Sequence, residues 1–88
     1  MRGLAGRVAL VTGAGGPMGL AVARRLAGEG MRLVLTDISA TRLQASRQAL
    51  GGSVAAALRA DATQRAEALA VVDAGQQACG AIDVLVNV

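Results

Sequence analysis

The stretch VTGAGGPMG at residues 11–19 decides the fold of this chain. The apolar run RVALVT at residues 7–12 leads into it, and residues 17–30, whose apolar positions recur with helical spacing, follow it. A strand that passes through a glycine turn into a helix aims backbone N–H groups and the positive end of the helix dipole at one point. The stretch therefore predicts a phosphate-binding loop, with a plain strand-to-helix connection as the alternative.

Pro17 stands inside this glycine-rich turn. Proline donates no N–H and holds φ near about −65°, so a glycine's freedom is lost at this position. Gly16, however, is an acceptable helix N-cap, and Pro17 would then occupy the first helical position, where proline is favoured and its missing donor is least needed. We expect the loop to survive with one donor fewer and to contact phosphate through other N–H groups, that of Met18 among them.

The rest of the chain continues the alternation of strands and helices. Short apolar runs predict three further strands, at residues 31–37, 53–60 and 82–88. The alanines of the second favour helix, and only its position between Gly52 and Asp61 favours a strand.

Two further helices are predicted between these strands. Ser39 can cap the first, and Gly51 and Gly52 end it. Its inward positions would be Leu43, Ser46 or Arg47, and Leu50. The second runs from after Thr63 to about Gly80, with Leu69 and Val72 facing inward.

This β-α-β-α-β-α-β order, without a linker, indicates an α/β fold. Successive apolar residues such as Val84, Leu85 and Val86 are typical of parallel strands covered by helices on both faces, joined by right-handed crossovers. We therefore predict a doubly wound parallel sheet. A last strand this apolar is expected to be central in a larger sheet, and as an edge strand it would promote association.

Composition excludes several functions. The 88 residues contain no His, Trp, Tyr or Phe, and all nine cationic side chains are arginines, so the usual general acids and bases other than carboxylates are missing.

The arginines are dispersed along the chain, and no aromatic side chain can stack on nucleic-acid bases, which argues against nucleic-acid binding. Cys79 is the only cysteine, which excludes an intrachain disulfide and a CxxC or similar metal-ligand pattern and suits a reducing cytoplasm. We expect it to pack as a small hydrophobe. Near the N-terminus, the apolar run at residues 8–11 is far shorter than a signal-peptide core or a membrane span.

Asp37 ends the second predicted strand, 24 residues after Gly13. This is near the spacing of about 20 at which a carboxylate accepts hydrogen bonds from the ribose of a dinucleotide, and the same charge would repel a 2′-phosphate. The alternative is that Asp37 only helps to start the helix around Ser39.

Together, TGAGGPMG (12–19), TD (36–37), DAT (61–63) and IDVLVN (82–87) resemble the N-terminal half of the short-chain dehydrogenases/reductases. The chain departs from the family's Thr-Gly-x-x-x-Gly-x-Gly at Pro17 and from its Asn-Asn-Ala-Gly at Val88. The resemblance implies a Rossmann-type sheet and a bound dinucleotide, NAD in preference to NADP because of Asp37. It assigns the pyrophosphate to Gly13, Gly16, Met18 and Gly19, the ribose to Asp37, the adenine to Asp61 and Ala62, and the strand ends near the cofactor to Asn87. Asp61 could equally belong to a helix start before Thr63.

The family performs hydride transfer with a Ser and a Tyr-x-x-x-Lys. This chain has no Tyr and no Lys, and Ser39, Ser46 and Ser53 do not match the catalytic serine. We therefore predict no catalytic and no metal-binding residue, and expect residues 1–88 to be the truncated N-terminal part of one NAD(P)-binding domain, inactive alone. In full length the resemblance implies a homo-oligomeric oxidoreductase acting on an alcohol or carbonyl substrate.

Two other functions compete with this one. A non-catalytic module, which binds nucleotide or associates through its open sheet edge, would fit a truncated or decayed product. A nucleotide-dependent methyltransferase shares the acidic end of the second strand, but VTG leading into Gly-Pro-Met-Gly fits it poorly.

Overall fold

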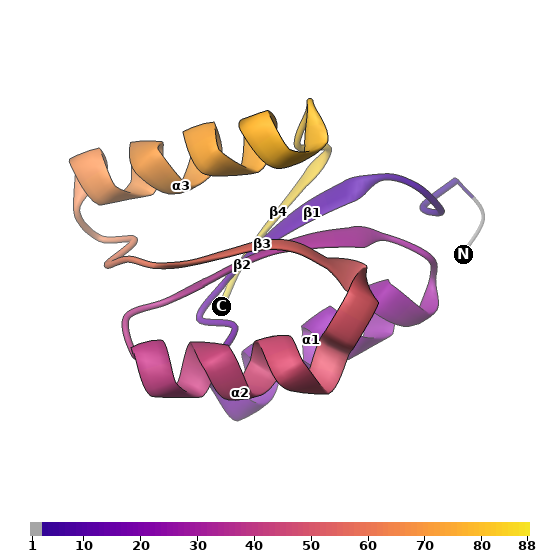
Figure 1. Cartoon of the computed structure of the whole chain (residues 1–88), viewed down its shortest axis with the longest axis horizontal. Coiled ribbons are helices and arrows are strands. Elements are labelled where there is room, and N and C mark those ends of the chain that lie inside the picture. The colour runs from indigo at the N-terminus through magenta and orange to yellow at the C-terminus, as the bar shows by residue number, and fades with distance from the viewer. Residues whose placement is uncertain (1–2) are drawn as a thin grey trace.

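A four-stranded parallel sheet forms the middle layer of the computed structural model, which describes residues 3–88. The helix α3 covers one face of the sheet, and α1 and α2 cover the other (Figure 1). The elements in chain order are β1 (Val8–Thr12), α1 (Pro17–Gly28), β2 (Arg32–Asp37), α2 (Ala40–Leu50), the 3-10 turn η1 (Gly51–Ser53), β3 (Val54–Arg59), α3 (Arg65–Cys79) and β4 (Val84–Asn87). The predicted order of strands and helices is confirmed, including the alanine-rich β3.

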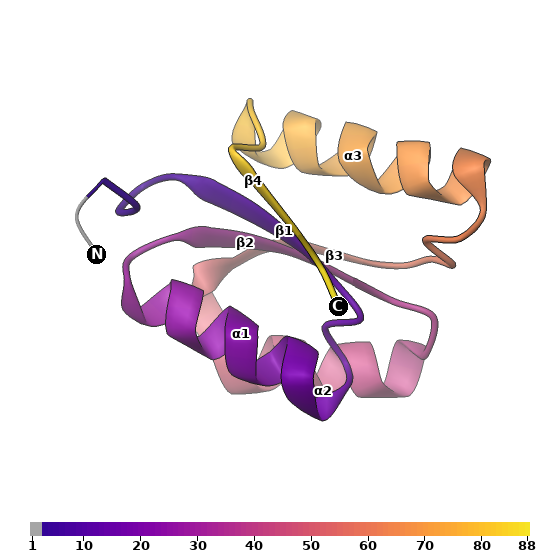
Figure 2. The same ribbon diagram turned by 180° about the vertical axis from the view of Figure 1, so that it is seen from behind.

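The strand order β3-β2-β1-β4 makes the sheet doubly wound. The chain moves outward from β1 through β2 to β3 and then crosses back to the other side of β1. Because crossovers between parallel strands are right-handed, the two directions place their helices on opposite faces. Seen from behind, β4 lies at the outside of the sheet beside β1, with Ala9 opposite Val84 and Thr12 opposite Asn87 (Figure 2).

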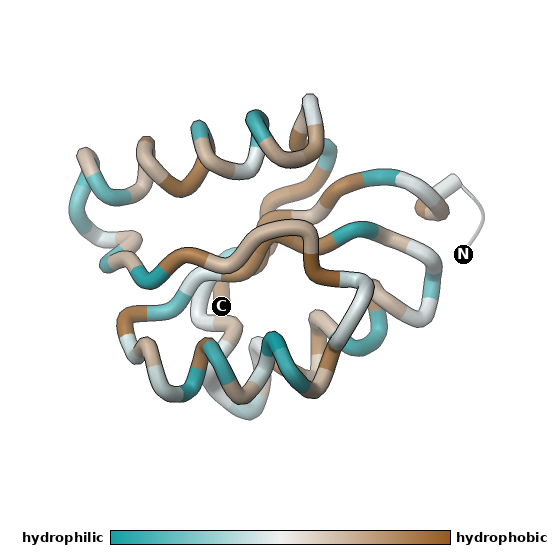
Figure 3. Tube along the Cα trace, in the orientation of Figure 1, coloured by the Kyte–Doolittle hydropathy of each residue, from teal (hydrophilic) through white to brown (hydrophobic). Residues whose placement is uncertain are grey.

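The side chains of the strands alternate between two hydrophobic clusters. Leu33 and Leu35 face the cluster under α1 and α2, which also contains Ala23 of α1 and Leu43 of α2. On the other face, Leu10 and Val34 pack with Val71 of α3. Figure 3 shows the hydrophobic residues concentrated along the strands between the two helical layers.

The ends of α2 are capped by the residues that the sequence predicts. Ser39 is the N-cap of α2, and its side chain accepts a hydrogen bond from the N–H of Arg42 over 3.3 Å. Gly51 ends α2 at a φ of 57°, which glycine adopts readily. Of the two inward candidates in α2, Ser46 is buried and Arg47 is exposed. No helix within residues 3–88 is long and apolar enough to cross a membrane.

One prediction for α3 is wrong. Leu69 is 57% exposed, and the buried residues of this helix are Val71 and Gly75. Residues that are two positions apart in a helix differ by about 200° around its axis, so Leu69 lies nearly opposite Val71. Gly75 sets the contact line, because a β-carbon there would lie 3.1 Å from Ile82 Cδ1 and 3.3 Å from the side chain of Val34. Val72 is partly buried beside this line, and Cys79 is a partly buried side chain packed on the same cluster.

Candidate functional site

The glycine loop turns at the end of β1 and leads directly into α1. Gly13 has a φ of 64°, and the N–H of Ala14 donates to the carbonyl oxygen of Thr36 over 3.0 Å. Gly16 is the N-cap of α1 in an extended conformation, with φ −80° and ψ 166°, and Pro17 follows at the first helical position. The predicted use of Pro17 as a helix start is confirmed, and the N-terminus of α1 is aimed at the loop.

Gly19 allows α1 to begin this close to the loop. It is buried, and a β-carbon on it would overlap the carbonyl oxygen of Gly13. Met18, beside it, is 70% exposed, so its side chain extends into solvent from the first turn of the helix. The four residues predicted for the pyrophosphate therefore lie in one loop and one helical turn.

Asp37 lies at the end of β2 and connects two segments. Its Oδ2 accepts a hydrogen bond from the N–H of Gly15 over 2.8 Å, and its Oδ1 accepts one from the N–H of Ser39, also over 2.8 Å. The alternative that Asp37 assists the start of α2 thus describes part of its role. Because each carboxylate oxygen can accept two hydrogen bonds, acceptor capacity remains on both for a ribose hydroxyl.

Asp61 follows β3 and shapes the turn before α3. Its Oδ1 accepts hydrogen bonds from the hydroxyl and the N–H of Thr63, over 2.6 Å and 3.0 Å. These two bonds lower the pKa of the Asp61 carboxyl, because they stabilise its charged form. The N–H of Asp61 donates to Oε1 of Glu67, 3.1 Å away, which ties the turn to the first turn of α3. This geometry agrees with the helix-start alternative and leaves Ala62 exposed next to the turn.

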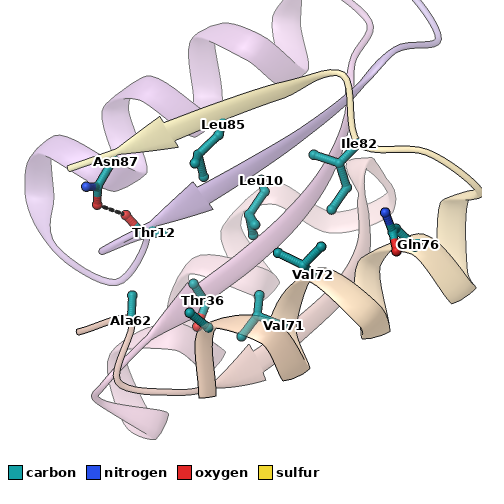
Figure 4. Close-up of a pocket in the computed structure, with 11 residues that line it drawn as sticks. Leu10, Thr12, Thr36, Ala62, Val71, Val72, Gln76, Ile82, Leu85 and Asn87 are labelled. Atoms are coloured by element: carbon teal, nitrogen blue, oxygen red, sulfur yellow. Dashed lines mark hydrogen bonds between the residues drawn. The ribbon is translucent and has the colours of Figure 1, made fainter. Parts of the chain in front are cut away.

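Asn87 pairs with the end of β1. The Thr12 hydroxyl donates to Oδ1 of Asn87 over 2.7 Å and accepts from the N–H of Val88 over 3.2 Å. Figure 4 shows the side-chain nitrogen of Asn87 on the side away from Thr12. Asn87 therefore joins the carboxyl ends of β1 and β4.

A pocket of about 380 Å³ lies between α3 and the face of β1, β2 and β4. Most of the side chains that line it are apolar, among them Leu10, Val71, Val72, Ile82 and Leu85 (Figure 4). Three residues at the carboxyl ends of β1, β2 and β4 and one after β3 also line it: Thr12, Thr36, Asn87 and Ala62. The sequence indicated no such pocket, because its lining comes from residues far apart in the chain.

The predicted residues thus gather at one edge of the sheet. Gly13, Asp37, Asp61 and Asn87 each stand at or just after the carboxyl end of a strand, and in a parallel sheet these ends lie together. In Figure 1 this is the edge from which the chain enters all three helices. Within residues 3–88, no group of three His, Cys, Asp or Glu side chains could hold a metal ion.

An open parallel sheet with a glycine loop, a helix N-terminus and an acidic residue at the end of β2 defines a dinucleotide-binding fold. The family model described as short chain dehydrogenase matches residues 7–88. The chain belongs to this family of oxidoreductases.

Individual relatives agree with this assignment. Galactitol 2-dehydrogenase (L-tagatose-forming) of Cereibacter sphaeroides is 43% identical over 84 residues, which are 96% of this chain and 33% of that protein. A short-chain dehydrogenase/reductase of Burkholderia phymatum, solved in complex with NAD, superposes with a TM-score of 0.90 at 35% identity, over 97% of this chain and 31% of that one. An NAD⁺-bound xylitol dehydrogenase superposes with a TM-score of 0.88 at 33% identity, over 96% of this chain and 33% of that one. The chain spans about a third of the length of these relatives.

Proposed function

We propose that this chain binds NAD(H) at the carboxyl edge of its sheet, as the cofactor-binding part of an oxidoreductase. One observation carries the proposal: the glycine loop that leads into the N-terminus of α1 also donates, through the N–H of Gly15, to the carboxylate of Asp37. A helix N-terminus attracts the pyrophosphate, and a carboxylate accepts from the ribose. The NAD complexes of two similar structures support the same choice of ligand.

The residues at the edge of the sheet fit this ligand. Gly13, Gly16 and Gly19 carry no side chain that would fill the loop, and Met18 can offer its N–H from the first turn of α1. Asp37 would hold the adenosine ribose, and Asp61 and Ala62 would border the adenine. Asn87 would keep the ends of β1 and β4 together beside the cofactor.

When bound, NADH would donate a hydride to a carbonyl compound, and NAD⁺ would accept a hydride from an alcohol. The 88 residues contain neither the Tyr nor the Lys with which the family moves the proton, so in our proposal this part binds and orients the cofactor and is inactive alone. We further propose that the full-length enzyme is a cytoplasmic homo-oligomer that acts on a small alcohol or carbonyl compound.

We also propose that NAD is preferred over NADP. The negative charge of Asp37 would face the 2′-phosphate of NADP at the position where the ribose hydroxyl of NAD can donate to it. Its bonds to Gly15 and Ser39 keep the carboxylate at this position.

Fluorescence titration of the chain with NADH and with NADPH tests both parts of the proposal, and the absence of Trp keeps the protein background low. We expect the unaltered chain to bind NADH more tightly than NADPH. Asp37→Asn should weaken the binding of NADH about tenfold and reduce the difference between the affinities for NADH and NADPH. Arg47→Gln is the matched control, because Arg47 is exposed on α2. Tighter binding of NADPH by the unaltered chain would refute the preference, and binding of neither would refute the function.

A second candidate is a module that only associates through its sheet edge. Leu85 is exposed, and within residues 3–88 no strand pairs with the outer side of β4, which favours this candidate. A soluble, folded oligomer that binds neither NADH nor NADPH would support this candidate over the first.

A further inference from the structure

Ser46 connects the middle of α2 to the glycine loop. It is 2% exposed, and its hydroxyl donates to the carbonyl oxygen of Ala14 over 2.8 Å, across 32 residues of sequence. A serine within a helix commonly bonds to a carbonyl of its own preceding turn or faces solvent. Ser46 instead holds a backbone group of the loop.

The bond from Ser46 reaches one end of a peptide group whose other end is also held. The Ala14 carbonyl and the Gly15 N–H belong to the same trans peptide, so they point in opposite directions. The Gly15 N–H donates to Oδ2 of Asp37 over 2.8 Å. Rotation of this peptide would therefore break the bond to Ser46 and the bond to Asp37 together.

The Ala14 end of this peptide group is buried. Ala14 is completely buried, and a β-carbon on Gly15 would lie 2.6 Å from Cβ of Arg42 and 2.9 Å from Oδ2 of Asp37. Water has no access to the Ala14 carbonyl in such packing, so loss of the Ser46 hydroxyl would leave a buried acceptor unpaired. Such a group favours conformations in which the peptide turns away.

We propose that Ser46 is a positioning residue for the ribose-binding carboxylate. By holding the Ala14 carbonyl, it fixes the orientation of the Gly15 N–H. That N–H and the N–H of Ser39 together fix the two oxygens of Asp37. The inference rests on the proposed function, since it concerns the adenosine ribose of NAD(H).

Amide hydrogen exchange of the 88-residue chain tests the positioning without any ligand. In Ser46→Ala we expect exchange at Gly15 to accelerate about tenfold more than exchange at Leu35 in the core strand β2, as expected for loss of one buried hydrogen bond. A general loss of stability would instead accelerate exchange at both amides by the same factor. Ser53→Ala is the matched control, because Ser53 lies in η1, at the C-terminal end of α2, and it should leave the ratio of the two rates unchanged.

A second variant covers the case in which Ser46→Ala unfolds. Ser46→Cys fills nearly the same space with a weaker donor. The exchange rate of the Gly15 amide should then lie between its rates in the unaltered chain and in Ser46→Ala. If Ser46→Ala cannot be measured, the Gly15 amide of Ser46→Cys should still exchange faster than that of the unaltered chain. Equal acceleration at Gly15 and Leu35 in whichever variant folds overturns the inference.

NADH titration provides the functional readout. We expect Ser46→Ala to bind NADH about tenfold more weakly than the unaltered chain or Ser53→Ala. Unchanged affinity in Ser46→Ala, beside an unaltered chain that binds, also overturns the inference. If the unaltered chain binds no NADH, the proposed function fails, and the exchange rates at Gly15 still decide whether Ser46 holds the peptide.

Discussion

Gly19 lies so close to Gly13 that a β-carbon on Gly19 would overlap the Gly13 carbonyl oxygen. The atom it would meet belongs to the backbone and cannot swing aside as a flexible side chain would. The first turn of α1 can therefore lie against the loop only with glycine at this position, and the aim of the helix N-terminus at the predicted phosphate depends on it.

Gly19→Ala is expected to lower the free energy of unfolding by about 3 kcal/mol, the upper part of the range for overpacking. Gly28→Ala is the matched control in the same helix, because a β-carbon on Gly28 meets nothing within 4 Å. That variant should raise the free energy of unfolding by about 0.5 kcal/mol, since alanine restricts the unfolded chain. Urea denaturation measures both, and equal effects of the two substitutions would contradict this account of Gly19.

Pro17 is expected to be neutral for the cofactor and favourable for the fold. Its ring matches the first position of α1, and the N–H that it lacks would have no partner within the helix. Pro17→Ala should therefore lower the free energy of unfolding by about 0.5 to 1 kcal/mol. It should change NADH affinity by less than about threefold.

Comparison of Pro17→Gly with Pro17→Ala separates the missing donor from the missing flexibility, because alanine restores only the N–H, whereas glycine restores the N–H and the conformational freedom. Titration with NADH compares the three chains. A gain of about a hundredfold in affinity for Pro17→Gly would show that proline damages the loop.

The strands, helices and caps could be predicted because their signals are local. The glycine turn, the Ser39 cap and the apolar runs each act over a few residues. Even β3, whose alanines favour helix, forms a strand, because it pairs with β2 along its length, from Leu33 opposite Val54 to Asp37 opposite Arg59. Tertiary pairing overrides propensity at this position.

The face of α3 could not be predicted, because apolar residues lie nearly all around this alanine-rich helix. Leu69 is exposed, and the helix instead packs through the small Gly75, which lies close to Val34 and Ile82. The sequence also left Ser46 and Arg47 as equal candidates for the inside of α2. The choice depends on the Ala14 carbonyl, which no pattern within α2 reveals.

The loop after β3 should respond to acid through Asp61. The Thr63 hydroxyl and N–H lower the pKa of the Asp61 carboxyl in the folded chain. The stabilisation is therefore present above the carboxyl's pKa in the unfolded chain, about 4, and is lost as pH falls through the lowered value. Thr63→Val removes the hydroxyl and should raise the pKa of Asp61 towards its ordinary value.

NMR titration of the Asp61 carboxyl measures this shift directly. Thr41→Val, an exposed threonine of α2, is the matched control and should leave the Asp61 titration unchanged. The expected effect is confined to acid, so the two variants should differ in Asp61 charge below about pH 4 and agree at pH 7. An unchanged Asp61 pKa in Thr63→Val would contradict the role of the hydroxyl.

The open side of β4 should make this chain associate. β4 pairs only with β1 within residues 3–88, so its other side presents unpaired backbone groups, and Leu85 is 64% exposed beside the apolar pocket. Sedimentation should show a mean mass that rises with concentration above the 8.7 kDa of one chain. Leu85→Lys places a charge on the edge strand, which opposes edge pairing, and should lower the mean mass towards that of the monomer at each concentration.

Ile38→Lys is the control. It adds the same charge to an exposed apolar residue after β2 and should leave the mean mass unchanged. If both lysines act alike, net charge rather than the β4 edge controls association.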